Sequence, residues 1–175
     1  MSKEKIQIVG TSKSKEQNAY YIQSKEKFWG LIERSKHGIR YEPEEFNSFS
    51  QKTGVGFCEL VFDKIVPKDK DLKEDLAMVQ SGVDDFVNYL KSNNKPDVIA
   101  FNGKTSAGWF LEYIDKNEIT KRPGKYLNSI APEFDYGKFP RLFNGVQIYV
   151  LPNTSGVAAK HWKEEPWLDF WNEVL

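Results

Sequence analysis

Residues 96–104 read Pro-Asp-Val-Ile-Ala-Phe-Asn-Gly-Lys, and the segment Lys104 to Asn117 that follows carries apolar side chains at helical spacing. A short apolar run that ends in a glycine-bearing turn and leads into a helix is typical of a buried strand in an open α/β sheet. In such sheets, ligands bind in the crevice at the carboxyl ends of the strands. This stretch therefore predicts both the class of fold and the edge of the sheet at which a site should lie.

Two further apolar runs repeat this pattern. Ile6 to Val9 ends at Gly10, and Val146 to Leu151 ends at Pro152-Asn153. Strands that alternate with helices predict three α/β/α layers around a central, mostly parallel sheet of four or five strands. Helical periodicity or a helical tail is expected in the segments Lys25 to Arg34, Asp71 to Ser92, Lys104 to Asn117 and Pro166 to Leu175.

Two segments are less regular. Gly54 to Val66 is apolar, which favours a buried strand or an extended segment. Thr120 to Gly145 is rich in glycine, proline and aromatic residues without a clear period, so we expect a long ordered loop or a small subelement. Because no repeat and no low-complexity linker interrupts the chain, residues 1–175 are expected to form a single domain.

Composition limits the functional classes. The 25 basic and 25 acidic residues cancel, whereas a protein that binds nucleic acid by bulk electrostatics would be more basic. Any contact with nucleic acid must therefore come from local patches and helix N-termini. The single cysteine, Cys58, excludes an intramolecular disulfide and suits a reducing cytoplasm.

Membrane and metal partners are not expected. No stretch of the sequence approaches the roughly 20 apolar residues that a membrane span needs. His37, Cys58 and His161 are far apart and lack the spacing of metal ligands. We expect a cytoplasmic protein that uses neither a metal nor another cofactor and acts as a monomer.

Four segments stand out in order along the chain. They are residues 8–14 (Ile-Val-Gly-Thr-Ser-Lys-Ser), 53–61 (Thr-Gly-Val-Gly-Phe-Cys-Glu-Leu-Val), 96–104 and 150–157 (Val-Leu-Pro-Asn-Thr-Ser-Gly-Val), and Tyr21 stands eight positions before the Trp29 of a Phe-Trp pair. Together they resemble the uracil-DNA glycosylase superfamily, and the mismatch-specific uracil/thymine branch most closely. The motifs of that branch read Gly-Ile-Asn-Pro-Gly, Gly-x-Gly-Leu-Thr-Asp-Leu-Val, Pro-x-Val-Val-Ala-Phe-Leu-Gly-Lys and Val-Leu-Pro-Asn-Pro-Ser-Gly-Leu, with an aromatic residue eight positions before the Trp of its Phe-Trp pair.

The resemblance implies an enzyme that extrudes a damaged or mismatched base from DNA, duplex or single-stranded, and removes it by attack of water at C1′. Tyr21 would stack on the base, and Glu59 would read its edge with a carboxylate that only accepts hydrogen bonds when ionised. Backbone N–H groups near Gly10 and Thr11, with the amide of Asn153, would meet the negative charge on the departing base.

The resemblance also implies a DNA-binding loop that begins after Asn153. Ser155 and Gly156 are small enough to approach phosphate closely, Val157 would be an apolar wedge between bases, and Lys160 would touch phosphate. Each of these residues also has a structural interpretation. Tyr21 could pack on the core, Glu59 could be a surface or paired carboxylate at a strand end, Asn153 suits a turn, and Ser155 could cap a helix.

The first motif departs from the family pattern. Where the family has the Asn-Pro-Gly whose Asn positions the attacking water, this chain has Ser12-Lys13-Ser14. Serine is a poor general base at neutral pH without a partner. Ser12, with Asn18 in the following loop or Glu26 in the segment where a hypoxanthine-specific branch has an Asn, is therefore the candidate set for holding the water.

Three hypotheses follow. The first is a monofunctional DNA glycosylase that acts on uracil, hypoxanthine or a related base. The second is a catalytically degenerate module on the same fold that binds nucleic acid or a modified base without efficient cleavage. The third is an unrelated α/β enzyme, although neither a phosphate-binding loop nor a dinucleotide fingerprint is present in the sequence.

Overall fold

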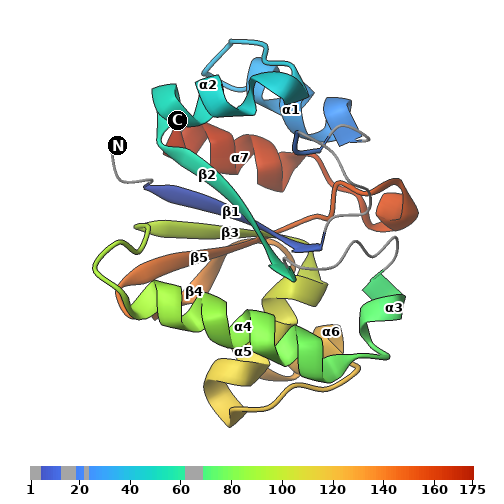
Figure 1. Cartoon of the computed structure of the whole chain (residues 1–175). Helices are drawn as coiled ribbons and strands as arrows, with labels where there is room; N and C mark the ends of the chain where they lie inside the picture. Colours follow the sequence, from blue (N-terminus) through green and yellow to red (C-terminus); the bar gives the residue numbers. More distant parts are fainter. Residues whose placement is uncertain (1–4, 13–18, 22–23, 62–68) are drawn as a thin grey trace.

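In the computed structural model, which describes residues 5–12, 19–21, 24–61 and 69–175, five strands form a mixed sheet in the order β2-β1-β3-β5-β4 (Figure 1). Four neighbouring strands are parallel, and β4 pairs antiparallel with β5 at one edge. This arrangement confirms the predicted mostly parallel sheet. The strands are β1 (Ile6–Ser12), β2 (Val55–Val61), β3 (Val98–Asn102), β4 (Gly137–Phe143) and β5 (Val146–Leu151).

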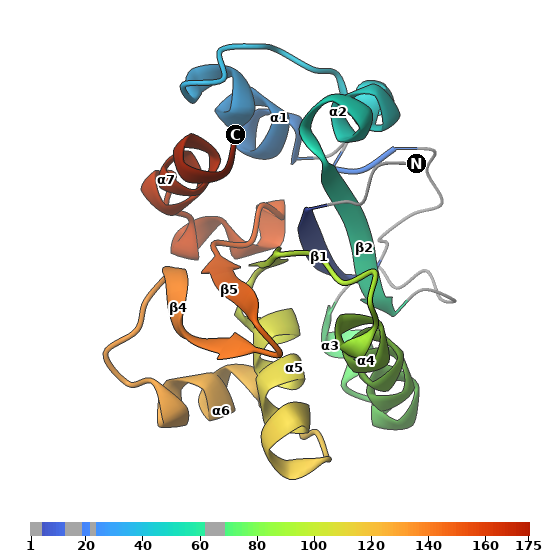
Figure 2. The ribbon, with the colours of Figure 1, turned by 90° about the vertical axis from the view of Figure 1, so that its left-hand side faces the viewer.

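Helices cover both faces of the sheet, which confirms the predicted three-layer architecture (Figures 1 and 2). The upper layer of Figure 1 holds α1 (Lys25–Arg34), α2 (Phe46–Thr53) and α7 (Glu165–Val174). The lower layer holds α4 (Leu76–Lys91), α5 (Lys104–Lys116) and α6 (Pro123–Ile130). Shorter helical segments are α3 (Asp69–Leu72) and the 3-10 turns η2 (Pro43–Glu45) and η3 (Gly156–His161).

Alternation along the strands divides the buried side chains into two cores. On β1, Ile8 packs with the upper layer and Val9 with the lower layer, because successive side chains of a strand point to opposite faces. The upper core is unusually aromatic, and burial of each large side chain contributes about 1.5–3 kcal/mol. Its fully buried aromatic members are Phe28, Trp29, Phe49, Trp167, Phe170 and Trp171.

The periodicity of residues 71–92 is divided between two helices, where the sequence predicted one. α3 ends at Leu72, and α4 begins after Asp75, whose side chain accepts a hydrogen bond of 3.2 Å from the backbone N–H of Met78. An aspartate at this position satisfies one of the N–H groups that a helix start leaves without a partner. The cap therefore fixes the start of α4 inside an apolar stripe that looks continuous.

The segment Thr120 to Gly145, expected to be a loop or small subelement, contains α6 and β4. A hairpin joins β4 to β5 through Asn144 and Gly145, which both have positive φ, at 48° and 79°. An Asn-Gly pair suits such a tight turn because both residues tolerate the left-handed conformation. The region is therefore more regular than its composition suggested.

No helix in the part of the chain that the structure describes is long and apolar enough to cross a membrane.

Candidate active site

The carboxyl ends of β1, β2, β3 and β5 meet at one edge of the sheet, on the right in Figure 1. The parallel register places Gly10 of β1 beside Glu59 of β2, and Asn102 of β3 beside Leu151 of β5. Residues from four distant parts of the sequence are therefore neighbours here, as the crevice rule for open α/β sheets predicts.

The Glu59 side chain lies directly over Gly10. A Cβ atom built on Gly10 would stand 2.0 Å from Oε2 of Glu59 and 2.9 Å from its Oε1. Such distances are far below ordinary van der Waals contact, so only glycine leaves room for the carboxylate in this position. Glu59 is 9% exposed, which argues against a carboxylate on the surface and leaves a paired carboxylate as the structural interpretation.

Tyr21 is held against the upper core in a strained backbone conformation. Its φ is 58°, a value that bulky residues rarely adopt and that tends to occur at functional sites. Its ring stacks on Phe28, with centroids 4.2 Å apart and 20° between the ring planes. Because Tyr21 as a residue is only partly buried and one face is occupied by Phe28, the opposite face is the one that a flat ligand could use.

The hydroxyl of Tyr21 points toward the polar groups at the strand ends. Burial raises the pKa of this hydroxyl well above its ordinary value, the nearby Glu59 carboxylate raises it further, and a hydrogen bond with Asn102 lowers it. The phenol is therefore protonated at neutral pH and available as a hydrogen-bond donor. Tyr21 therefore makes the core contact of the structural interpretation and also lies near Glu59, while stacking on a base stays a prediction.

Asn102 and Thr154 tie the ends of β3 and β5 together. The Nδ2 of Asn102 donates to the Thr154 hydroxyl, the backbone N–H of Thr154 donates to Oδ1 of Asn102, and both distances are 3.0 Å. Both residues are buried. A reciprocal pair of this kind fixes the two loops relative to each other, and it was missed because the sequence assigned no role to either residue. The available signal was a polar residue at the end of a buried apolar strand.

Asn153 lies next to Thr154 and above the start of α5. Its Oδ1 accepts a hydrogen bond of 2.8 Å from the backbone N–H of Ser155, which leaves its Nδ2 group to donate elsewhere. A Cβ atom on Gly103 would stand 3.1 Å from that Nδ2, and Gly103 has a φ of 116° that favours glycine. Asn153 therefore makes the turn expected by the structural interpretation and also presents an oriented amide N–H at the strand ends.

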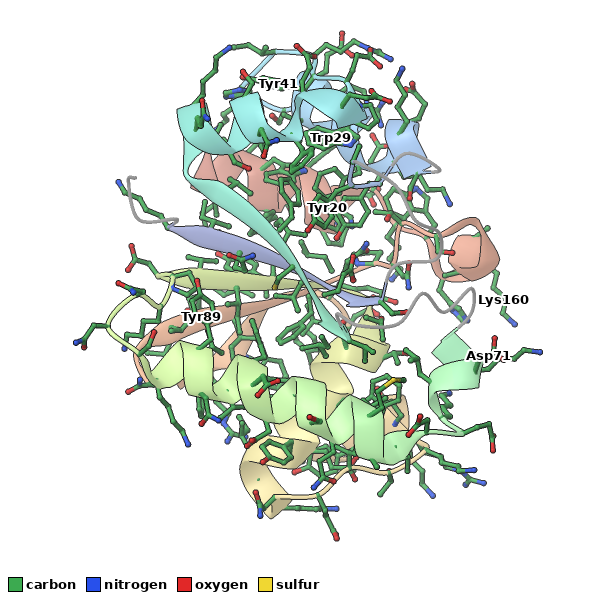
Figure 3. All side chains as sticks on the ribbon, in the orientation of Figure 1. Tyr20, Trp29, Tyr41, Asp71, Tyr89 and Lys160 are labelled. Atoms are coloured by element: carbon green, nitrogen blue, oxygen red, sulfur yellow. The ribbon has the colours of Figure 1, made fainter. Side chains whose placement is uncertain are left out.

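The predicted DNA-binding residues follow on the same side of the molecule. The carbonyl of Ser155 accepts from the N–H of Ala158 at the start of η3, which contains Gly156 and Val157. Lys160, in the same turn, is exposed and projects from the edge where β1 and β5 end (Figure 3). Lys27 lies 5.0 Å from the centre of the Trp162 ring, which adds a second cation next to this turn.

Two indole N–H groups anchor the loops of the crevice. Trp29 donates to the carbonyl of Tyr20 over 2.9 Å, and Trp167 donates to the carbonyl of Pro152 over 2.7 Å. Figure 3 shows Tyr20 and Trp29 between the sheet and the upper helices. The aromatic core therefore positions both the segment that carries Tyr21 and the turn that carries Asn153.

Of the three candidates for holding the attacking water, Ser12 and Glu26 are not brought together. Ser12 ends β1 and is partly buried at the crevice edge of the sheet, next to buried Thr11. Glu26 faces solvent instead, with its side chain 68% exposed and 3.2 Å from the guanidinium of Arg40. Asn18 lies outside the described residues. Glu26 is therefore not positioned as a partner of Ser12.

Groups of three or more His, Cys, Asp or Glu side chains that could hold a metal ion do not occur among the residues described here.

Comparison with known proteins adds independent evidence to this geometry. A search of curated proteins gave no match. A family model described as the uracil DNA glycosylase superfamily matches residues 2–175. Since that match spans nearly the whole sequence, and the polar residues of its motifs meet at the carboxyl ends of the parallel strands, this chain belongs to the uracil-DNA glycosylase superfamily.

Proposed function

We propose that the protein is a monofunctional DNA glycosylase that hydrolyses the N-glycosidic bond of a flipped, damaged base such as uracil or hypoxanthine. Superfamily membership supports glycosylase chemistry in DNA repair in general. The observation that carries the proposal further is the meeting of a carboxylate, an aromatic ring and an amide at one edge of the sheet. These groups come from Glu59, Tyr21 and Asn153.

In the proposed reaction, Tyr21 and Glu59 bind the base. The extruded base stacks on the face of Tyr21 that is turned away from Phe28, a contact worth about 1–3 kcal/mol per base. Glu59 accepts a hydrogen bond from a ring N–H at the base edge. Uracil, hypoxanthine and xanthine all present such a donor, so the carboxylate suits this group of lesions.

In the proposed reaction, residues at the carboxyl ends of β1 and β5 hold the attacking water and stabilise the departing base. A water molecule held by Ser12 attacks C1′, and the electron pair of the glycosidic bond leaves with the base. The Nδ2 group of Asn153 and backbone N–H groups near Gly10 and Thr11 stabilise the developing negative charge. Because Oδ1 of Asn153 is already held by Ser155, the amide is preorganised and needs no rotation during the reaction.

DNA binding is assigned to the turn after Asn153. Ser155 and Gly156 approach phosphate, Val157 enters the base stack, and Lys160 neutralises a phosphate. With a net charge of zero, the protein has little bulk attraction for DNA, so binding should be of modest affinity and, because few phosphates are neutralised, should weaken only gradually as salt is added.

A cleavage panel tests the proposal. The intact protein is incubated at low salt with single-stranded and duplex oligonucleotides that carry uracil, hypoxanthine, xanthine or a G·T mispair. Alkali then cleaves the strand at any abasic site. We expect abasic product from at least one of these lesions under single-turnover conditions. An Asn153→Ala protein purified in parallel controls for contaminating glycosylases.

If none of the lesions gives abasic product, the proposal that the protein is a glycosylase is rejected. Binding of the same oligonucleotides, followed by fluorescence anisotropy, then distinguishes a glycosylase-fold module without cleavage from a protein that does not recognise DNA.

Glu59→Gln should change which base is preferred. Glutamine keeps the length of the side chain but replaces one acceptor oxygen with a donor, so a base with a ring N–H loses the better of two acceptors. We expect the single-turnover rate for the preferred lesion to fall about 10-fold, as is usual when a buried charge-assisted hydrogen bond is weakened. Glu173→Gln, on α7 and far from the crevice, is the matched control. Equal rates for the wild type and Glu59→Gln would remove Glu59 from base recognition.

A further inference from the structure

A cavity of about 500 Å³ opens between β2 and α4, in the lower layer. Glu59 is one of its lining residues, and others, such as Leu60 and Phe86, belong to the lower core, on the face of the sheet away from α1. Figure 3 shows one lining residue, Tyr89, on the side of α4 that is turned toward the sheet. The volume lies within the range of small-molecule sites in proteins.

The wall of the cavity combines apolar surface with a buried amide. Leu60, Met78 and Phe86 contribute apolar groups, and Gln7 of β1 reaches the cavity from the middle of the sheet. Gln7 is only 4% exposed, and its Oε1 atom has no hydrogen-bond partner. Most buried polar atoms are hydrogen-bonded. A buried polar atom that faces a cavity without a partner indicates that a bound molecule supplies its hydrogen bond.

The mouth of the cavity carries a negative charge. Asp85 and Ser81 lie on α4, line the same cavity and are exposed to solvent. The cavity therefore has a hydrogen-bond acceptor on Gln7 in its interior, apolar side chains along its wall, and the carboxylate of Asp85 at its mouth. A ligand that satisfies all three has an N–H donor on a small apolar ring and a positively charged group.

We propose that this cavity, which shares Glu59 with the glycosylase crevice, is a second ligand site for a small aromatic amine whose ring N–H bonds Gln7 and whose ammonium group lies near Asp85. The chemistry of the wall explains why a glutamine stands on a central strand between Ile6 and Ile8, where apolar side chains are the rule. Cys58 lines the same cavity and is the only cysteine in the chain, so its alkylation reports on occupancy of this site.

Tryptamine is a suitable probe because it has both a ring N–H and an ammonium group. We expect it to shift the amide signals of Met78 and Gly82 in ¹⁵N NMR spectra and to leave those of Gly103 and Asn153 unchanged. It should also slow the alkylation of Cys58 by iodoacetamide. 1-Methyltryptamine, which lacks the ring N–H, should bind about 10-fold more weakly, the factor that about 1.4 kcal/mol represents.

Two variants test the contact with the ring N–H and the contact with the ammonium group separately. Gln7→Leu should bind tryptamine and 1-methyltryptamine equally, and Asp85→Asn, on the protein surface, should weaken both by a similar factor. Asp169→Asn, an exposed aspartate on α7, is the charge control and should change neither. If Gln7→Leu is poorly folded, Gln7→Met gives the same test with an unbranched side chain.

Equal binding of the two probes by the wild type, or signal shifts confined to the crevice, would overturn the proposal, as would the absence of binding at millimolar tryptamine. The cleavage panel measures glycosylase activity without tryptamine, so failure of the second site and failure of the proposed function can be told apart.

Discussion

Gly82→Ala is expected to destabilise the protein by about 3 kcal/mol, although alanine is the better residue in the interior of a helix. Gly82 lies in α4, where the helix backbone rests on β2. A Cβ atom at this position would stand 1.9 Å from the carbonyl oxygen of Leu60 and 3.0 Å from its carbonyl carbon. Both are backbone atoms of a paired strand, so the clash is relieved only if α4 moves away from the sheet.

Urea unfolding followed by far-ultraviolet circular dichroism measures this effect. Gly124→Ala is the matched control, because Gly124 also lies in a helix and a Cβ atom there would meet nothing within 4 Å. The control should be neutral or slightly stabilising, by up to about 1 kcal/mol. An unfolding midpoint for Gly82→Ala that equals or exceeds that of the wild type would show that α4 does not contact β2 as described.

Asn153→Ala is expected to lower the single-turnover rate of base excision by about 10²–10³-fold, the usual effect of removing one donor that stabilises a developing anion. The reason is the fixed orientation of the amide: Oδ1 accepts from the N–H of Ser155, so Nδ2 must donate in another direction. Asn153→Asp keeps the acceptor and the shape of the side chain but removes the donor. It should therefore lose at least as much activity as the alanine variant.

The control for these variants is Asn172→Ala. Asn172 also accepts a backbone N–H, that of Lys36 over 2.7 Å, but it lies on α7. Its loss should leave the rate of base excision within a factor of about 2, since surface changes away from the site rarely act on chemistry. A rate for Asn153→Ala close to that of Asn172→Ala would show that Asn153 only shapes the turn.

The secondary structure of this protein was predictable where local pattern is strong. The bounds Lys25–Arg34 and Val146–Leu151 match the sequence-based expectation, because helical periodicity and an apolar run are properties of the segment itself. The elements that were not predicted individually have weaker local signals. α2 is short and polar, and β4 alternates irregularly, so their structure depends on the surfaces that they pack against.

The Asn144-Gly145 pair is an instructive exception. It is among the strongest short signals for a hairpin, and it would have placed a strand on each side of the turn. The overall glycine and proline content of the surrounding segment concealed it. Composition averaged over 26 residues was therefore less informative than a single dipeptide at its end.

The individual residues of the candidate site could be proposed only from the family motifs. The contacts that these residues make with one another could not be predicted from the sequence. The sequence by itself determined the strands, most of the helices, the polar residues at the strand ends and the family to which the chain belongs. Tertiary structure alone decided that the Glu59 side chain lies over Gly10 and that Asn102 is hydrogen-bonded to Thr154. It also decided that Glu26 pairs with Arg40 and not with Ser12. The physical reason is that strand pairing and side-chain direction depend on contacts between segments that are separated in the sequence, by 52 residues for Asn102 and Thr154, and no local pattern encodes such contacts.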